Sequence, residues 1–64
     1  MNRILKFFGY EHLQGELRKT SLKFSDLAYW IERNVADGPE KTVALRKLLE
    51  AKDAAVRAKL HPGG

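Results

Sequence analysis

Asp37-Gly38-Pro39-Glu40 interrupts a chain that is otherwise made of segments with helical periodicity. Pro39 fits the first position of a helix, because a missing amide costs nothing there, and Glu40 suits the positive end of the helix dipole. Asp37 or Gly38 is then the expected N-cap. The stretch therefore predicts the turn of an α-helical hairpin, with one long helix on each side.

The segment 38–60 after this turn consists almost entirely of good helix formers. Small and apolar residues at alternating steps of four and three predict a seam against another helix: Ala44, Leu48, Ala51, Ala55 and Ala58. A second apolar row lies beside it, formed by Leu45, Leu49 and Val56. On the charged face, Arg46 with Glu50 and Asp53 with Arg57 have the spacing of helix-surface ion pairs.

The segment 21–37 before the turn carries the other long helix. Its apolar residues recur at steps of three and four, which is one face of an α-helix: Phe24, Leu27, Ala28, Ile31 and Val35. Thr20 or Ser21 is the expected N-cap. The short connection makes the two helices antiparallel neighbours. We expect an all-α hairpin with an N-terminal arm at 1–20, which contains a short helix weakened by Gly15, and a tail at 61–64.

Composition points to one domain that needs partner copies of itself. A chain of 64 residues has a marginal core, and without cysteine it has neither disulfides nor thiolate ligands. One hairpin cannot cover two wide apolar faces together with Trp30, Phe7 and Phe8, so the surplus is expected to be subunit interface. The apolar run at the start is too short to span a membrane, which favours a soluble, cytoplasmic protein.

The sequence offers no catalytic constellation and no cofactor motif. It has no nucleophile elbow, no Gly-rich phosphate loop and no HExxH helix, and the two histidines lie near opposite ends. The formal charge of +4 suits an anionic partner, which leaves DNA, RNA, lipid headgroups and small phosphorylated ligands open. We therefore expect a binding protein rather than an enzyme.

Three features suggest where such an anion binds. Tyr10 lies between a glycine and a polar segment, and its ring either stacks on a base or covers the rim of the arm. Lys23, with Ser21 and Ser25, has the form of a phosphate seat at a helix N-terminus, or it is a solubilising lysine. Arg57 or Lys52 either projects into an anion pocket at a subunit junction or belongs to a solvated face. His12 alone is more often packed or solvent-facing than a ligand.

Three stretches resemble the phage hairpin family of anti-CBASS cyclic-nucleotide sponges. They cover most of residues 8–58: Phe8-Gly9-Tyr10-Glu11-His12-Leu13, Lys23-Phe24-Ser25-Asp26-Leu27-Ala28, and Thr42-Val43-Ala44-Leu45-Arg46-Lys47-Leu48-Leu49-Glu50-Ala51-Lys52-Asp53-Ala54-Ala55-Val56-Arg57-Ala58. The last stretch is the most specific. Many relatives carry proline after the His-Leu pair, where this chain has Gln14-Gly15.

The resemblance implies a homohexamer whose N-terminal arms reach adjacent subunits. It implies sites for cyclic dinucleotides between paired subunits, with Tyr10, Lys23 and His12, and sites for cyclic trinucleotides where three subunits meet, with Arg57, Ser25 and Arg46. Such a protein sequesters second messengers without a cofactor in the cytoplasm of an infected bacterium, and so counters CBASS defence. The residues also leave open a small basic helical phage regulator that binds polymeric nucleic acid, and a purely structural oligomerisation module.

Overall fold

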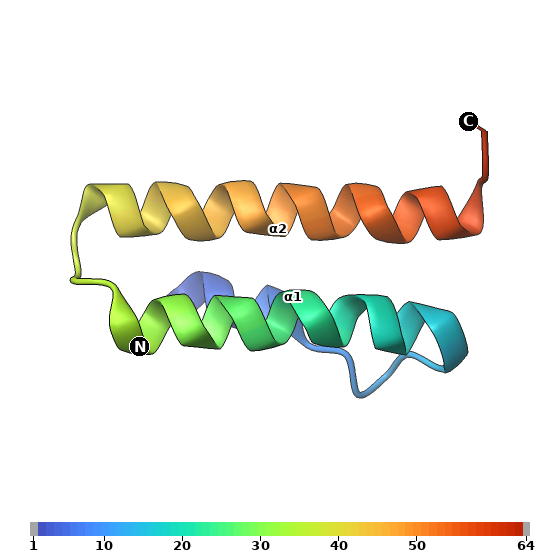
Figure 1. Cartoon of the computed structure of the whole chain (residues 1–64), viewed down its shortest axis with the longest axis horizontal. Coiled ribbons are helices and arrows are strands. Elements are labelled where there is room, and N and C mark those ends of the chain that lie inside the picture. The colour runs from blue at the N-terminus through green and yellow to red at the C-terminus, as the bar shows by residue number, and fades with distance from the viewer. Residues whose placement is uncertain (1, 64) are drawn as a thin grey trace.

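The computed structural model describes residues 2–63, and Met1 and Gly64, the ends of the expected arm and tail, lie outside the described residues. The chain forms a 3₁₀ helix, η1 (Arg3–Phe8), and two α-helices, α1 (Gly15–Asn34) and α2 (Pro39–Leu60). The two α-helices run antiparallel, joined by a short loop (Figure 1). The expected all-α hairpin is confirmed.

The turn and the second helix follow the sequence prediction closely. Gly38 is the N-cap of α2, Pro39 is its first residue, and the helix ends at Leu60. The amide of Thr42 donates to the carbonyl of Gly38 at 3.3 Å, which closes the first turn. The helix thus begins where proline costs no hydrogen bond.

The first long helix begins earlier than predicted. It includes the segment that was expected to be a separate short helix, and its first residue is Gly15, at a φ of 60°. Residues with a Cβ rarely adopt this conformation, so the glycine suits the start of the helix rather than weakening its interior. The prediction of a cap at Thr20 or Ser21 is wrong: Gln14 holds the N-cap position without a side-chain bond.

The buried face of α1 also differs from the predicted apolar stripe. Ser21, Ser25 and Ala28 are its buried residues, whereas Leu27 and Val35 are exposed. The helix ends at Asn34, three residues before the expected boundary at 37, and Val35 is already extended. Small side chains on the buried face leave room for another segment to approach the helix closely.

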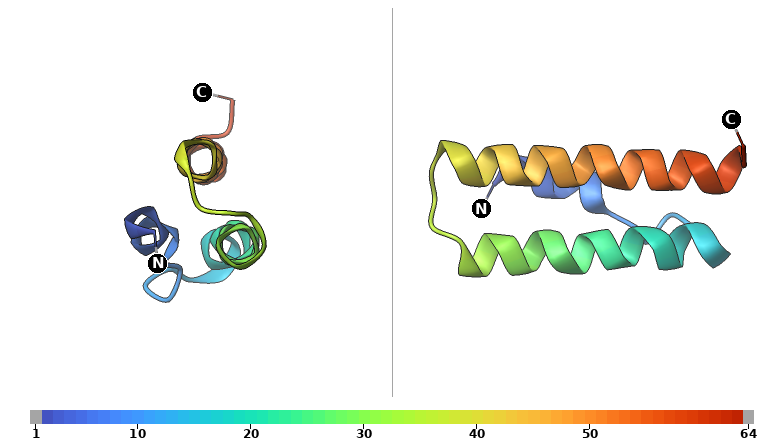
Figure 2. Two further views of the ribbon diagram at one scale, coloured as in Figure 1. Left: turned by 90° about the vertical axis from the view of Figure 1, so that its left-hand side faces the viewer. Right: turned by 45° about the horizontal axis from the view of Figure 1, so that its top comes forward.

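That segment is the N-terminal arm, which packs onto its own hairpin. Seen end-on, η1, α1 and α2 form a triangle (Figure 2). Leu5 and Phe8 of η1 form the buried core with Ala28 of α1 and Leu45 of α2, and Phe8 is 0% exposed. The inference that Phe8 lies outside the hairpin core is therefore wrong, whereas Phe7 is exposed.

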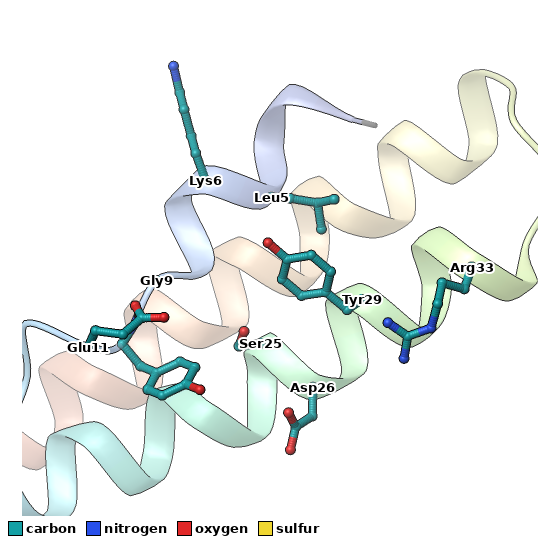
Figure 3. A pocket seen from close by; sticks show the side chains of 9 residues that line it. Leu5, Lys6, Gly9, Glu11, Ser25, Asp26, Tyr29 and Arg33 are labelled. Atoms are coloured by element: carbon teal, nitrogen blue, oxygen red, sulfur yellow. The ribbon is translucent and has the colours of Figure 1, made fainter.

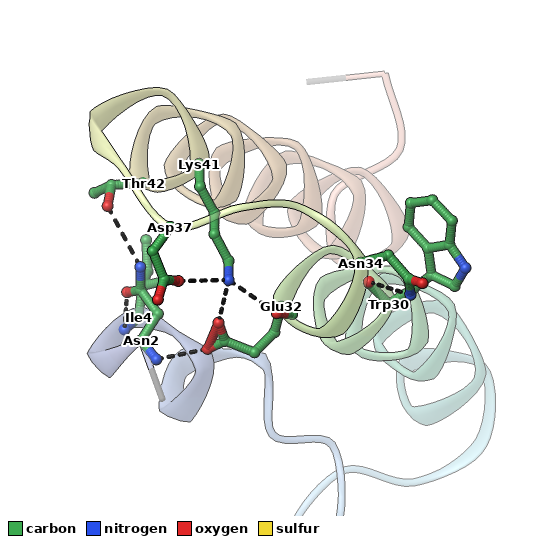
Figure 4. Close-up of polar contacts among 8 residues, drawn as sticks. All are labelled: Asn2, Ile4, Trp30, Glu32, Asn34, Asp37, Lys41 and Thr42. Atoms are coloured by element: carbon green, nitrogen blue, oxygen red, sulfur yellow. Dashed lines mark hydrogen bonds and ion pairs between the residues drawn. The ribbon is translucent and has the colours of Figure 1, made fainter.

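A polar cluster of Asn2, Glu32, Asp37 and Lys41 ties the arm to the hairpin loop (Figure 4). The Lys41 side chain is 4% exposed, and its Nζ lies 2.6 Å from Glu32 Oε1 and 2.8 Å from Asp37 Oδ1. It also donates to the backbone carbonyl of Glu32 at 2.8 Å. The other carboxylate oxygen of Glu32 accepts the amide of Asn2 at 2.6 Å. This buried cation is satisfied on three sides.

Within the hairpin, α2 packs mainly through its leucines, which come from both predicted rows. Leu45 is buried, and Leu48 and Leu49 pack against the core, whereas Ala44, Ala51 and Ala58 are exposed. Of the predicted seam, Leu48 therefore packs inside the hairpin, whereas Ala44, Ala51 and Ala58 do not. Large apolar side chains are also uncovered on the single chain, among them Leu27 at 47% and Trp30 at 53% exposure.

Candidate ligand-binding site

The arm and α1 enclose a surface pocket of about 560 Å³. Figure 3 shows the side chains that line it, some from the N-terminal arm and some from α1. The lining residues are Leu5, Lys6, Gly9, Tyr10, Glu11, Ser25, Asp26, Tyr29 and Arg33. Two tyrosines thus share a cavity with a lysine, an arginine and two carboxylates. Two of the residues singled out from the sequence, Tyr10 and Ser25, meet here.

Tyr10 is held at this pocket by its neighbours in the arm. The guanidinium carbon of Arg18, in the first turn of α1, lies 5.6 Å from the centre of the Tyr10 ring, which is a cation–π distance. The amide of Tyr10 donates to Glu11 Oε2 at 3.1 Å. The backbone amides of Glu11 and Tyr10 lower the pKa of the Glu11 carboxyl, so Glu11 is charged at neutral pH. Arg18 therefore contacts the ring, and Glu11 holds the backbone of the same residue.

Apart from Ser25, sequence reasoning missed the α1 side of the pocket. Asp26, Tyr29 and Arg33 follow one another at steps of three and four, which places them on one face of the helix. None of these three residues is a site candidate in the sequence analysis. The spacing itself was the available signal, but only the position of the arm shows that this face lines a cavity.

A second pocket of about 470 Å³ lies between the arm, α1 and α2. His12 and Arg57 both line it, together with Lys6, Phe7, Gly9, Leu13, Ser21, Lys52, Asp53 and Val56. The Nζ of Lys52 lies 3.0 Å from Asp53 Oδ1. The pairs that meet in one chain, Tyr10 with Ser25 and His12 with Arg57, thus cut across the two sets that the resemblance implies.

Lys23 and Arg46 are exposed and line neither of these pockets. Lys23 lies more than two turns beyond the start of α1 at Gly15, where the backbone amides are bonded within the helix. The predicted position of Lys23, Ser21 and Ser25 at a helix N-terminus is therefore wrong. Both serines are instead buried.

The predicted ion pairs on α2 are replaced by others. Glu50 lies 3.9 Å from Lys47 rather than pairing with Arg46, and Asp53 pairs with Lys52 rather than with Arg57. Within residues 2–63, neither Arg46 nor Arg57 has a carboxylate oxygen within 4.0 Å. Both guanidinium groups are therefore available to an external anion.

The described residues hold neither a candidate metal site nor a candidate membrane span. Between Asn2 and Gly63, no group of three or more histidine, aspartate or glutamate side chains is arranged to hold a metal ion. Neither α1 nor α2 is long and apolar enough to cross a membrane, as far as the described residues go.

Comparison with known proteins gives no match. No protein-family model matches the chain. No curated protein is significantly similar to it. No solved structure is significantly similar to it either.

Proposed function

We propose that this protein is a non-catalytic, homo-oligomeric sponge for cyclic di- and trinucleotide second messengers, and that it thereby antagonises CBASS anti-phage defence. The observation that carries the proposal is the pocket between the arm and α1, which is lined by Tyr10, Tyr29 and Arg33, while the side chain of Lys6 extends outward from its edge (Figure 3). Aromatic faces stack on bases of any kind, and cationic side chains form charge-assisted bonds to phosphates. The site therefore has groups for both parts of a nucleotide.

Oligomerisation is supported by the apolar side chains that the single chain leaves uncovered. Leu27 and Trp30 lie one turn apart on α1, and both are about half exposed. A ligand with two or three similar nucleotides is well matched by two or three copies of one surface. We propose that the oligomer is the homohexamer that the resemblance implies.

The residue roles come from the resemblance. In dinucleotide sites Tyr10 stacks on a base, with Lys23 and His12 beside it. In trinucleotide sites Arg57 and Arg46 contact phosphates and Ser25 contributes its hydroxyl. Because Lys23 and Arg46 lie outside the pockets that Tyr10 and Arg57 line, each set is complete only when different subunits contribute to one site.

Sequestration needs affinity and abundance but no chemical step. Stacking contributes about 1–3 kcal/mol per base, and several subunits repeat the contact on one ligand. A sponge then lowers the free concentration of the messenger by mass action. Binding in this way prevents the messenger from activating its effector.

Calorimetric titration with a panel of cyclic di- and trinucleotides tests the proposal. We expect saturable binding to the wild-type protein and a loss of about tenfold or more in dinucleotide affinity for Tyr10→Ala, with unchanged oligomer mass. The matched control is Tyr10→Phe, which keeps the ring and should retain most of the affinity. If the wild-type protein leaves every member of the panel free, the proposal is wrong.

A second candidate is a small regulator that binds polymeric nucleic acid. The exposed cations Lys23 and Arg46, outside both pockets, and the net charge of +4 favour it. Contacts to a polymer backbone release counterions, so affinity falls steeply with salt. Tight binding of linear oligonucleotides with a steep salt dependence, and no preference for cyclic ligands, would support this candidate over the sponge.

A further inference from the structure

One buried hydroxyl in the described chain has no hydrogen-bond partner. Ser21 is 1% exposed, and its Oγ is the only buried side-chain oxygen or nitrogen among residues 2–63 that lacks a bond. Buried polar groups nearly always have a partner, because an unpaired hydroxyl loses its bonds to water and gains nothing in return. A serine inside a helix commonly bonds to the carbonyl four residues earlier, and Ser21 does not.

Ser21 lines the pocket between the arm and the two helices, which we call the cationic pocket. Its rim carries three cationic side chains, Lys6, Lys52 and Arg57, against the single carboxylate of Asp53 among the lining residues. His12 adds a ring N–H donor. The charge at this site therefore exceeds what the protein itself neutralises.

The other walls of the cationic pocket are apolar. Phe7, Leu13 and Val56 line it, and the ring of Phe7 is exposed with Lys6 Nζ 5.1 Å from its centre. A small anion alone would leave this surface unused. An anion attached to a flat or apolar body would cover it.

We propose that the cationic pocket binds a phosphate group within a single subunit. The hydroxyl of Ser21 donates to a phosphate oxygen, while Lys52 and Arg57 supply the opposite charge. Lys52 exchanges its contact with Asp53 for the phosphate when the ligand enters. The pocket shares His12 and Arg57 with the proposed cyclic-nucleotide sites. The inference does not rest on those sites, because orthophosphate is tested against groups that one chain supplies, whereas sites for cyclic nucleotides need several chains.

Orthophosphate and the phosphate of a nucleoside monophosphate share this chemistry. The exposed ring of Phe7 favours the nucleotide, because a base can stack on it. We therefore expect adenosine monophosphate to bind more tightly than orthophosphate, and Phe7→Leu to remove that difference while leaving orthophosphate binding unchanged. Equal affinities of the two ligands for the wild-type protein would assign the pocket to free phosphate.

The decisive variant is Ser21→Ala, with Thr20→Ala as the matched removal of a hydroxyl outside the pocket. Orthophosphate is titrated at constant ionic strength and followed by the amide resonances of residues 12, 21 and 52. We expect saturation in the wild-type protein and in Thr20→Ala, and about tenfold weaker binding in Ser21→Ala. Wild-type affinity in Ser21→Ala, or no saturable shift in the wild-type protein, would overturn the proposal.

Thermal unfolding without phosphate separates binding from folding. Because Ser21 Oγ has no partner and alanine is the better helix former, Ser21→Ala should be at least as stable as the wild-type protein. A clearly lower midpoint would mean that the hydroxyl is bonded within the protein, which contradicts the inference. Phosphate should raise the midpoint of the wild-type protein more than that of the variant.

Removing a positive charge from the cationic pocket provides an independent test of the proposal. Lys52→Gln should weaken orthophosphate binding, whereas Lys47→Gln, which changes an exposed lysine of the same helix outside the pocket, should not. Equal effects of the two substitutions would show that the anion responds only to net charge. That result would overturn the assignment of the pocket.

Discussion

Lys41 shows at the scale of one residue how this small chain holds its arm in place. Its ammonium group is almost fully buried and has three oxygen partners, two of them on Glu32. Glu32 in turn holds the amide of Asn2. A buried charge without partners is far less stable than one in water, so the members of this cluster depend on one another.

We expect Lys41→Met to lower the midpoint of thermal unfolding by several degrees. The variant keeps the length of the side chain but leaves Glu32, whose side chain is 14% exposed, without its cation. Lys47→Met is the control, because Lys47 is exposed and its nearest carboxylate oxygen is 3.9 Å away. Equal midpoints for the two variants, measured by circular dichroism, would show that the cluster adds nothing to stability.

The same cluster predicts a dependence of stability on pH. The amide of Asn2 and the ammonium of Lys41 hold the pKa of Glu32 below its usual 4.5. A carboxyl whose pKa falls on folding stabilises the protein fully above 4.5, and this stabilisation is lost as the pH drops through the folded pKa. Lys41, whose pKa is raised by Asp37 and Glu32, loses its contribution only above 10.5.

The variant Glu32→Gln tests the loss of stability at low pH that we assign to Glu32. The difference in free energy of unfolding between the wild-type protein and the variant should be constant near neutral pH and shrink progressively below about pH 4.5. Urea titrations at a series of pH values measure it. A difference that stays the same down to acid pH would contradict the assignment to Glu32.

At the scale of elements, α2 was predictable because its signals are local. Pro39 sets the start and a run of good helix formers continues to Leu60, so no distant contact is needed to define the helix. The start of α1 was not predictable in this way. Gly15 indicates a weak point in a helix unless its φ is known, and only the structure shows the value of 60°.

Gly15→Ala tests the role of this glycine. A Cβ at Gly15 would meet no atom within 4 Å, so the cost is conformational alone, and we expect about 1 kcal/mol lower stability in urea unfolding. Gly9→Ala is the control. The Gly9 φ is −59°, and an added Cβ would make only ordinary contacts, so this variant should match the wild-type protein. Equal stability of both variants would contradict the left-handed backbone conformation at Gly15.

The candidate site could be predicted from the sequence only in part. Tyr10 stands out because it lies outside the helical periodicity, and the structure places it at a pocket. Asp26, Tyr29 and Arg33 line the same pocket only because η1 packs along α1, and that contact depends on Phe8 filling the core. A segment of six residues with 3₁₀ geometry leaves too short a pattern to be found in advance.

At the scale of the whole molecule, the single chain is elongated, with dimensions of 36 × 23 × 15 Å, and its core is small. The buried apolar residues of that core are Leu5, Phe8, Ala28 and Leu45. Large apolar side chains lie outside it on both α-helices, and isolated ones would need no explanation. Leu27 and Trp30, however, are one turn apart on the same helix, which makes them the best candidates for contact between copies.

We expect the double variant Leu27→Asp, Trp30→Ser to have a much lower mass than the wild-type protein in sedimentation or light scattering, with unchanged helical content. Both side chains are about half exposed in one subunit, so their loss leaves the buried core intact, whereas a charge within an interface is costly without a partner. Leu60→Asp removes another exposed apolar side chain, at the far end of α2, and should keep the wild-type mass. A monomeric wild-type protein would contradict both this interface and the proposed sponge, because pockets shared by several subunits could not then form.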